Sequence, residues 1–268
     1  MKRTALVLLF LPLFGFAQTP MNQVEMQSKC DSILLESEIL YRYEKSAISA
    51  ITFAKSDKKL RNNFIEVFTY IEGDTVKAII LSKDRKMCLS ELSFCSDYGI
   101  AKTKNLNARI LSEKELKLLT IRQMIYNDIS KKGYEIKGLQ GYELHSILIP
   151  ADKGYKLYIV TATFDKDMIP YGNDYLFNAD RNGTVTSYEK FHSRLIPTPA
   201  KYNGNRVVSS THTHLETTPF ITATDICTFR IYGAICGQQY FEVLSIALDK
   251  IFKYDLEKNQ IEIEDMPR

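Results

Sequence analysis

Apolar and polar positions recur with two different periods along this chain, and the two periods separate helices from strands. From Gln23 to about Ser56, apolar residues recur at helical spacing among charges without Pro or Gly, which predicts one long or two shorter amphipathic helices. A second helix follows Leu111, because Ser112 and Glu115 form a capping box and Gly133 ends the periodic stretch. Its apolar face predicts core packing and consists of Leu118, Ile121, Ile125 and Ile129.

Short β-rich segments bounded by Gly, Pro or Asn make up most of the remaining chain. Phe64–Ile71 and Val76–Leu81 flank a Glu-Gly-Asp turn and predict a hairpin, to which Met87–Phe94 adds a candidate third strand. A short helix is expected from Thr222 to about Tyr232. Further strands are expected at 142–149, 155–164, 175–178, 184–191, 206–211, 240–248, 251–254 and 260–264. The pattern predicts an α+β protein with a mixed β-sheet flanked by helices. A weak boundary near residue 110 separates an N-terminal α+β segment of unknown role, 18–110, from a domain at 111–268.

The first 17 residues have the pattern of a secretory signal. Lys2 and Arg3 precede an apolar run of about ten residues, and small residues lead up to Ala17. The run is short for a membrane span, although a retained N-terminal anchor helix is the alternative. Cleavage after Ala17 would give an exported protein, periplasmic or extracellular, with no stable membrane insertion.

Charge and cysteine content narrow the function classes further. The formal net charge is +3, and Lys residues are interspersed with Asp and Glu, so no basic stripe for tracking nucleic-acid phosphates is present. Five cysteines are an odd number for an exported protein, which leaves at least one thiol unpaired within the chain. Cys88 with Cys95 and Cys227 with Cys236 are the local candidate pairs, and buried free thiols are the alternative.

The chemistry is concentrated in residues 210–225. His212 and His214 follow a β-branched run, so both imidazoles should lie on one face at a strand end. Asp225, in the first turn of the expected helix, supplies a carboxylate. Two imidazoles and one carboxylate suit zinc and leave a fourth position for water, as in a catalytic site. The alternative is that both histidines are polar rim residues and Asp225 only caps a helix.

The spacing His-Thr-His, ten residues and Asp resembles the JAMM motif of the MPN-plus metallopeptidases, which include deubiquitinating isopeptidases. His212, His214 and Asp225 match the family's metal ligands, and Thr222 stands at its Ser position, while Leu215 replaces its usual Pro. The resemblance covers residues 210–225 strictly and 155–256 loosely. It implies an MPN/JAB-like fold for 111–268, a bound Zn²⁺ and Thr222 as donor to the developing oxyanion.

The family's catalytic Glu has no counterpart in this chain. Asp174 is the best substitute for a general base and Glu189 the second, although Asp174 is equally readily explained as a turn residue after Gly172-Asn173. His192 is expected to face the cleft or to be a half-buried strand residue, and His145 has a similar pattern.

Three functional hypotheses follow. The first is an exported zinc-dependent hydrolase of amide bonds, a JAMM-like peptidase or isopeptidase acting on a peptide or protein. The second is a catalytically inactive MPN-like binding or scaffolding protein that still holds a metal. The third is a periplasmic structural protein in which the motif is accidental. The oligomeric state is left open.

Overall fold

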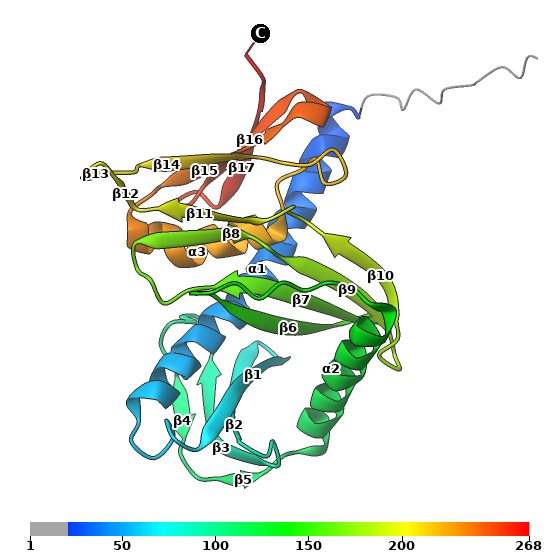
Figure 1. Cartoon of the computed structure of the whole chain (residues 1–268), viewed down its shortest axis with the longest axis vertical. Helices are drawn as coiled ribbons and strands as arrows, with labels where there is room; N and C mark the ends of the chain where they lie inside the picture. Colours follow the sequence, from blue (N-terminus) through cyan, green and yellow to red (C-terminus); the bar gives the residue numbers. More distant parts are fainter. Residues whose placement is uncertain (1–20, 268) are drawn as a thin grey trace, which may run out of the picture.

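Three β-sheets are stacked along the long axis of the molecule in a computed structural model that describes residues 21–267 (Figure 1). The first sheet contains β1 (Phe64–Glu72), β2 (Thr75–Ser82), β3 (Met87–Phe94), β4 (Thr103–Asn105) and β5 (Arg109–Ile110). The second has the order β10-β9-β7-β6, formed by Val185–Lys190, Tyr175–Asp180, Gly154–Ala162 and Glu143–Ala151. The third has the order β14-β15-β16-β17, formed by Ser209–Thr213, Tyr240–Ser245, Lys250–Asp255 and Gln260–Asp265. The predicted α+β class is confirmed.

One long helix connects these sheets. Helix α1 (Gln23–Ser56) begins at a capping box of Asn22 and Glu25 and runs unbroken, so the one-helix alternative holds. It packs against β1 and β2 at one end and against α3 and β17 toward the other. Cys30, Leu40 and Tyr43 of α1 share a hydrophobic core with α3 and the third sheet. The N-terminal segment therefore contributes to the core around the candidate site.

Helix α2 (Glu113–Lys132) covers the junction of the first and second sheets. The predicted capping box is present, and Gly133 ends the helix with a positive φ of 71°. The predicted apolar face is confirmed as core, since Leu118, Ile121, Ile125 and Ile129 are buried against Phe68, Ile79, Leu157 and Phe177 of the two sheets.

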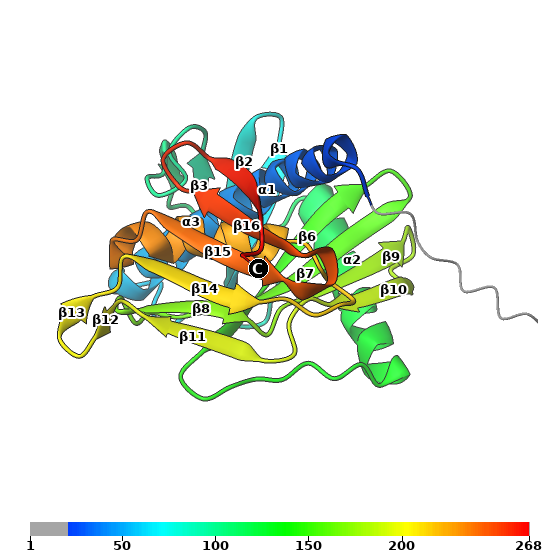
Figure 2. The same cartoon turned by 90° about the horizontal axis from the view of Figure 1, so that it is seen from above.

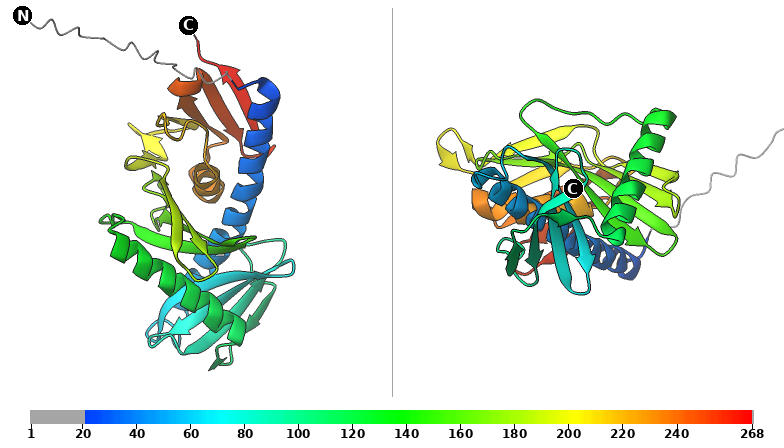
Figure 3. Two further views of the ribbon diagram at one scale, coloured as in Figure 1. Left: turned by 90° about the vertical axis from the view of Figure 1, so that its right-hand side faces the viewer. Right: turned by 90° about the horizontal axis from the view of Figure 1, so that it is seen from below.

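The candidate site lies in a β-α-β unit. Strand β14 pairs in parallel with β15, and helix α3 (Ala223–Cys236) connects them. In Figure 3 this helix is seen end-on, surrounded by the third sheet, the β8–β11 ribbon and α1. The carboxyl end of β14 consequently lies beside the amino end of α3, an arrangement that gathers polar groups at one edge.

Strands β8 (Met168–Gly172) and β11 (Leu195–Pro199) were not expected from the sequence. They form a separate two-stranded ribbon next to β14 and α3 (Figure 2). Pro170 pairs with Pro197, and prolines are tolerated there because each strand has a free edge. A second small ribbon pairs β12 (Lys201–Tyr202) with β13 (Asn205–Arg206), so the predicted strand from Arg206 begins only at Ser209.

The structure also tests the predicted cysteine pairs. All five cysteines lie within the described residues and are free thiols. Cys227 and Cys236 cannot pair because nine residues of one helix separate them by about 13 Å.

Among residues 21–267, no helix combines the length and apolarity that a membrane span requires. The predicted signal at 1–17 lies outside the described residues.

Candidate metal centre

The His-Thr-His segment ends β14 as its pattern predicts. His212 and His214 are buried while the intervening Thr213 is exposed, so both imidazoles point to the same side of the strand. The backbone N–H of His214 donates to the carbonyl of Leu244 at 3.0 Å, which extends the pairing with β15 past the end of β14. Both rings are thereby fixed by a parallel pair of buried strands.

Asp225 reaches the same point from α3. Thr222 is the N-cap of the helix, and its Oγ1 accepts from the Asp225 backbone N–H at 3.2 Å. The Asp225 carboxylate in turn accepts from the Thr222 backbone N–H at 3.0 Å and from its hydroxyl at 2.6 Å. The capping box therefore holds the carboxylate in one orientation, with Oδ1 beside His192 and His212 and Oδ2 beside His214.

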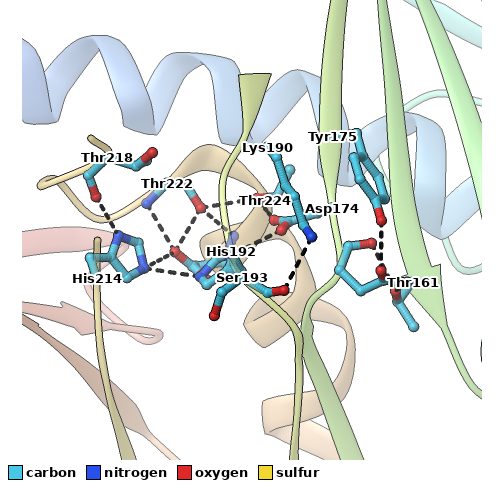
Figure 4. A network of polar contacts seen from close by, with 12 residues as sticks. Thr161, Asp174, Tyr175, Lys190, His192, Ser193, His214, Thr218, Thr222 and Thr224 are labelled. Carbon is cyan, nitrogen blue, oxygen red and sulfur yellow. Dashed lines mark hydrogen bonds and ion pairs between the residues drawn. The ribbon is translucent and has the colours of Figure 1, made fainter. Parts of the chain in front are cut away.

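A fourth group completes the cluster. His192, in the loop between β10 and β11, is buried, and its Nε2 lies 3.0 Å from Nε2 of His214 and 3.2 Å from Oδ1 of Asp225. Figure 4 shows His192 and His214 turned toward one another. Ligand atoms of His192, His212, His214 and Asp225 all lie within 4.8 Å of one another. This buried group can hold a metal ion.

Several separations within the cluster are close to those between ligands of a small tetrahedral cation. Nε2 of His214 lies 3.1 Å from Nε2 of His212 and 3.1 Å from Oδ2 of Asp225, and Nε2 of His212 lies 3.3 Å from Oδ1. Metal–ligand bonds of about 2.0–2.1 Å in tetrahedral geometry place ligands roughly 3.3 Å apart. The side chains therefore need little movement to enclose an ion.

Hydrogen bonds fix which ring nitrogens face the centre. Nδ1 of His214 lies 2.6 Å from the carbonyl of Phe220 and 3.1 Å from that of Thr218, so it carries the proton and donates. Nδ1 of His192 donates to Oδ1 of Asp174 at 2.7 Å. When a ring held in this way is neutral, as metal binding requires, its lone pair is on Nε2 and directed at the centre, and the Nδ1 hydrogen bond orients the ring as in metal-binding histidines.

Packing holds the third imidazole. The ring of His212 packs against Tyr171 of β8 and Phe241 of β15, at centroid distances of 5.1 and 6.1 Å. Tyr171 is itself held by a hydroxyl contact of 3.3 Å with Ser210. The unexpected β8 ribbon therefore supplies one wall of the centre.

The electrostatics of the cluster set one buried carboxylate, Asp225, against three histidines. Oδ1 of Asp225 is buried and accepts no hydrogen bond, despite its proximity to two histidines. Burial disfavours its charge, but the three surrounding histidines outweigh burial and hold the pKa of Asp225 well below its ordinary value. Burial likewise lowers the pKa of His212. For His192, burial is outweighed by Asp174 and Asp225, which raise its pKa well above the ordinary value. A proton on His192 is therefore what a metal ion would displace.

The other predicted site residues lie around the cluster in supporting positions. Both oxygens of Asp174 are engaged, one by His192 and the other by the hydroxyl of Thr224 (Figure 4). Its contacts are those of a residue that orients a ligand. The hydroxyl of Thr222 is occupied with Asp225 as a helix cap. Glu189 is exposed on β10. His145 is not a member of the cluster. Its Nδ1 lies 2.5 Å from Oε1 of Glu44 in α1.

His192 is the member of the cluster for which the sequence leaves two interpretations open. The sequence predicts that His192 either faces the cleft or is a half-buried strand residue. It predicts a water molecule, not a histidine, in the fourth coordination position of the metal. Its sequence signal was its place next to Phe191 at the end of the expected strand 184–191, and this gives no distance to His212, 20 residues away.

Comparisons with models of protein families, with curated proteins and with solved structures found no match to this chain. The resemblance to the JAMM motif thus rests on residues 210–225, and an MPN/JAB-like fold for 111–268 stays a prediction. The functional argument is carried by the geometry of the site.

Proposed function

We propose that this chain is an exported protein that binds one zinc ion through His192, His212, His214 and Asp225. The observation that carries the proposal is the convergence of three ring nitrogens and an unpartnered carboxylate oxygen in a buried space. A nitrogen-rich donor set without cysteine or methionine, at separations near those of a tetrahedron, favours zinc among the common metals.

The closed donor set favours a binding role for the metal. Four protein ligands complete a tetrahedron, as in structural zinc sites, whereas catalytic sites commonly keep one position for water. The ligands come from three separate segments, namely the loop after β10, the end of β14 and the start of α3. Zinc would join these segments and hold the loop at 215–222, which fits a binding or scaffolding protein.

An amide-bond hydrolase is the second candidate function. It is supported by the His-Thr-His and Asp225 spacing, with Thr222 at the position of the family's Ser. Four-coordinate zinc can accept a fifth ligand during a reaction, so water activation remains compatible with this donor set. Against it stands Asp174, whose two oxygens are both committed to hydrogen bonds.

Metal content tests the site. Residues 18–268 would be purified beside His212→Ala/His214→Ala and His192→Ala variants, and zinc measured by mass spectrometry. About one zinc per chain in the natural protein and none in the double variant is expected. Absence of zinc from the natural protein, even after zinc is added, would refute the proposal.

Cobalt substitution separates the two roles. The absorption spectrum of the cobalt-loaded protein reports coordination number, and acetohydroxamate is a small ligand that occupies open positions. In the binding role the natural protein gives a four-coordinate spectrum that hydroxamate leaves unchanged, while His192→Ala opens the site to it. A hydroxamate-dependent shift in the natural protein, together with turnover of peptide or isopeptide substrates, would favour the hydrolase.

A further inference from the structure

A cavity of about 250 Å³ lies directly beside the candidate metal centre. Helix α1, the second sheet and residues 217–223 enclose it. Much of its wall is apolar, formed by Ile33, Tyr158, Leu176, Phe191, Phe220 and Ile221. Its size suits a short aliphatic group rather than a folded partner.

The cavity shares its wall with the metal centre. The carbonyls of Thr218 and Phe220 accept from His214, and Thr222 bonds to Asp225, while all three residues line the cavity. Phe191 lines it immediately before His192. A ligand in this space would therefore contact the segment that the metal ligands hold in place.

The charged groups at the cavity favour a cation. Glu36 is already bound by Lys156 and by the hydroxyl of Tyr158. The carboxylate of Glu189 makes no hydrogen bond or ion pair with any residue in the described part of the chain. Burial, then Glu36 and Asp174, raise the pKa of Glu189, and only Lys29 opposes them. An added positive charge would meet a carboxylate that has no direct hydrogen-bond or ion-pair partner among the described residues, at this end of an apolar space.

We propose that this cavity binds a primary alkylammonium group, with its carbon chain against the apolar wall and its charge on Glu189. The proposal rests on the binding role given above and names the chemical class of ligand. It requires no bond to be made or broken. The occupant is a small amine or an amine-bearing side chain.

The test uses n-pentylammonium, with n-pentanol and pentanoate as neutral and anionic analogues of the same length. Binding to the zinc-loaded protein is followed by NMR titration at low ionic strength. We expect pentylammonium to bind with a Kd on the order of millimolar, more tightly than pentanol, and pentanoate not to bind. Shifted resonances should include Phe191 and Phe220.

Two variants that each remove one charge should change the affinity for pentylammonium in opposite directions. Glu189→Gln should weaken pentylammonium binding about five- to tenfold and leave pentanol unchanged, because only the charge is removed. Lys29→Gln should strengthen it, since a repelling charge is lost. Glu113→Gln, an exposed carboxylate on α2 away from the cavity, is the matched control and should change nothing.

The outcomes distinguish this proposal from the zinc proposal. Equal binding of pentanoate, an unchanged affinity in Glu189→Gln or no binding of pentylammonium would overturn the ligand class. Zinc content, measured on the same samples, is unaffected by any of these results. Loss of zinc without loss of pentylammonium binding would instead refute the metal site and retain the cavity assignment.

Discussion

At the scale of single residues, Asp174 decides how the metal centre is supported. It accepts from Nδ1 of His192 and from Thr224 while buried at 3% exposure. Asp174→Asn keeps the shape and removes the charge, so His192 loses its preferred tautomer. We expect zinc affinity, measured by chelator competition, to fall about 10- to 100-fold.

The same variant addresses the general-base hypothesis for Asp174. If Asp174 acts as a general base, Asp174→Asn should bind zinc with full affinity and lose turnover of an amide substrate. Asn178→Asp, at a half-buried position of β9, serves as a control for a nearby change of charge and should leave zinc affinity unaltered. Full zinc affinity in Asp174→Asn would contradict the orienting role.

His145 carries a second residue-scale prediction, on pH. Burial disfavours its charge, but Glu44 and Glu143 outweigh burial and raise the pKa of His145 to about 10. Because this folded-state pKa lies above the ordinary value of 6.5, its stabilising contribution is complete below about pH 6.5 and is lost as pH rises toward 10. The contribution is on the order of 5 kcal/mol.

Urea unfolding at pH 6 and pH 9.5 measures this contribution. The free energy of unfolding of the natural protein should decrease between the two pH values by more than that of His145→Gln. Thiols and tyrosines titrate in both proteins, so only the difference between them reports His145. Parallel pH dependence in the two proteins would show that the Glu44 pair contributes nothing.

At the scale of elements, two capping boxes allow a matched comparison. Ser112 and Glu115 begin α2, and Thr222 and Asp225 begin α3, with the same reciprocal hydrogen bonds. Ser112→Ala and Thr222→Ala should each lower the free energy of unfolding by about 1 kcal/mol. Only Thr222→Ala should also weaken zinc binding, about tenfold, because Asp225 loses its hydroxyl partner.

Thr222→Ser is the control for Thr222→Ala, because it keeps the hydroxyl that both capping and the proposed oxyanion role require. Serine keeps the hydroxyl, so stability and zinc affinity should remain close to those of the natural protein. Equal zinc affinity in Thr222→Ala and Ser112→Ala would mean that the cap does not support the metal ligand. Lost turnover with intact zinc affinity in Thr222→Ala would support the oxyanion role.

The elements also show what the sequence could predict. Strong local signals, such as the Ser112 cap, Gly133 and the period of α1, located helices closely. The β8–β11 ribbon was missed because its prolines weaken any strand signal, and only pairing with each other makes them strands. The motif located three residues of the candidate metal cluster because they follow one strand, turn and helix. The position of His192 depends on how the loop between β10 and β11 folds back toward β14. Local sequence patterns do not specify such a long-range arrangement.

At the scale of the whole molecule, α1 ties the metal-binding region to the first sheet. Its residues pack in both the core around α3 and the core of β1–β3, so the candidate centre rests on a support that runs along the whole molecule. Loss of the metal should consequently loosen the region around α3 and β14, while the first sheet at the other end of α1 keeps its structure.

Metal removal tests this arrangement. A ligand present at about 1,000 times its Kd stabilises the folded state by about 4 kcal/mol. For a chain of this size each kcal/mol corresponds to about 2–4 °C in Tm, so EDTA should lower the Tm by roughly 8–16 °C. His212→Ala/His214→Ala should show no EDTA effect.

Hydrogen exchange shows where the stability is lost. Metal-free protein should exchange faster in β14, in residues 215–222 and in the first turn of α3, because zinc joins these segments. Exchange in α2 should stay the same, since its core is formed with Phe68, Leu157 and Phe177, remote from the metal ligands. Faster exchange throughout the molecule would mean that the metal supports the entire fold, and unchanged exchange in β14 would argue that no metal is held there.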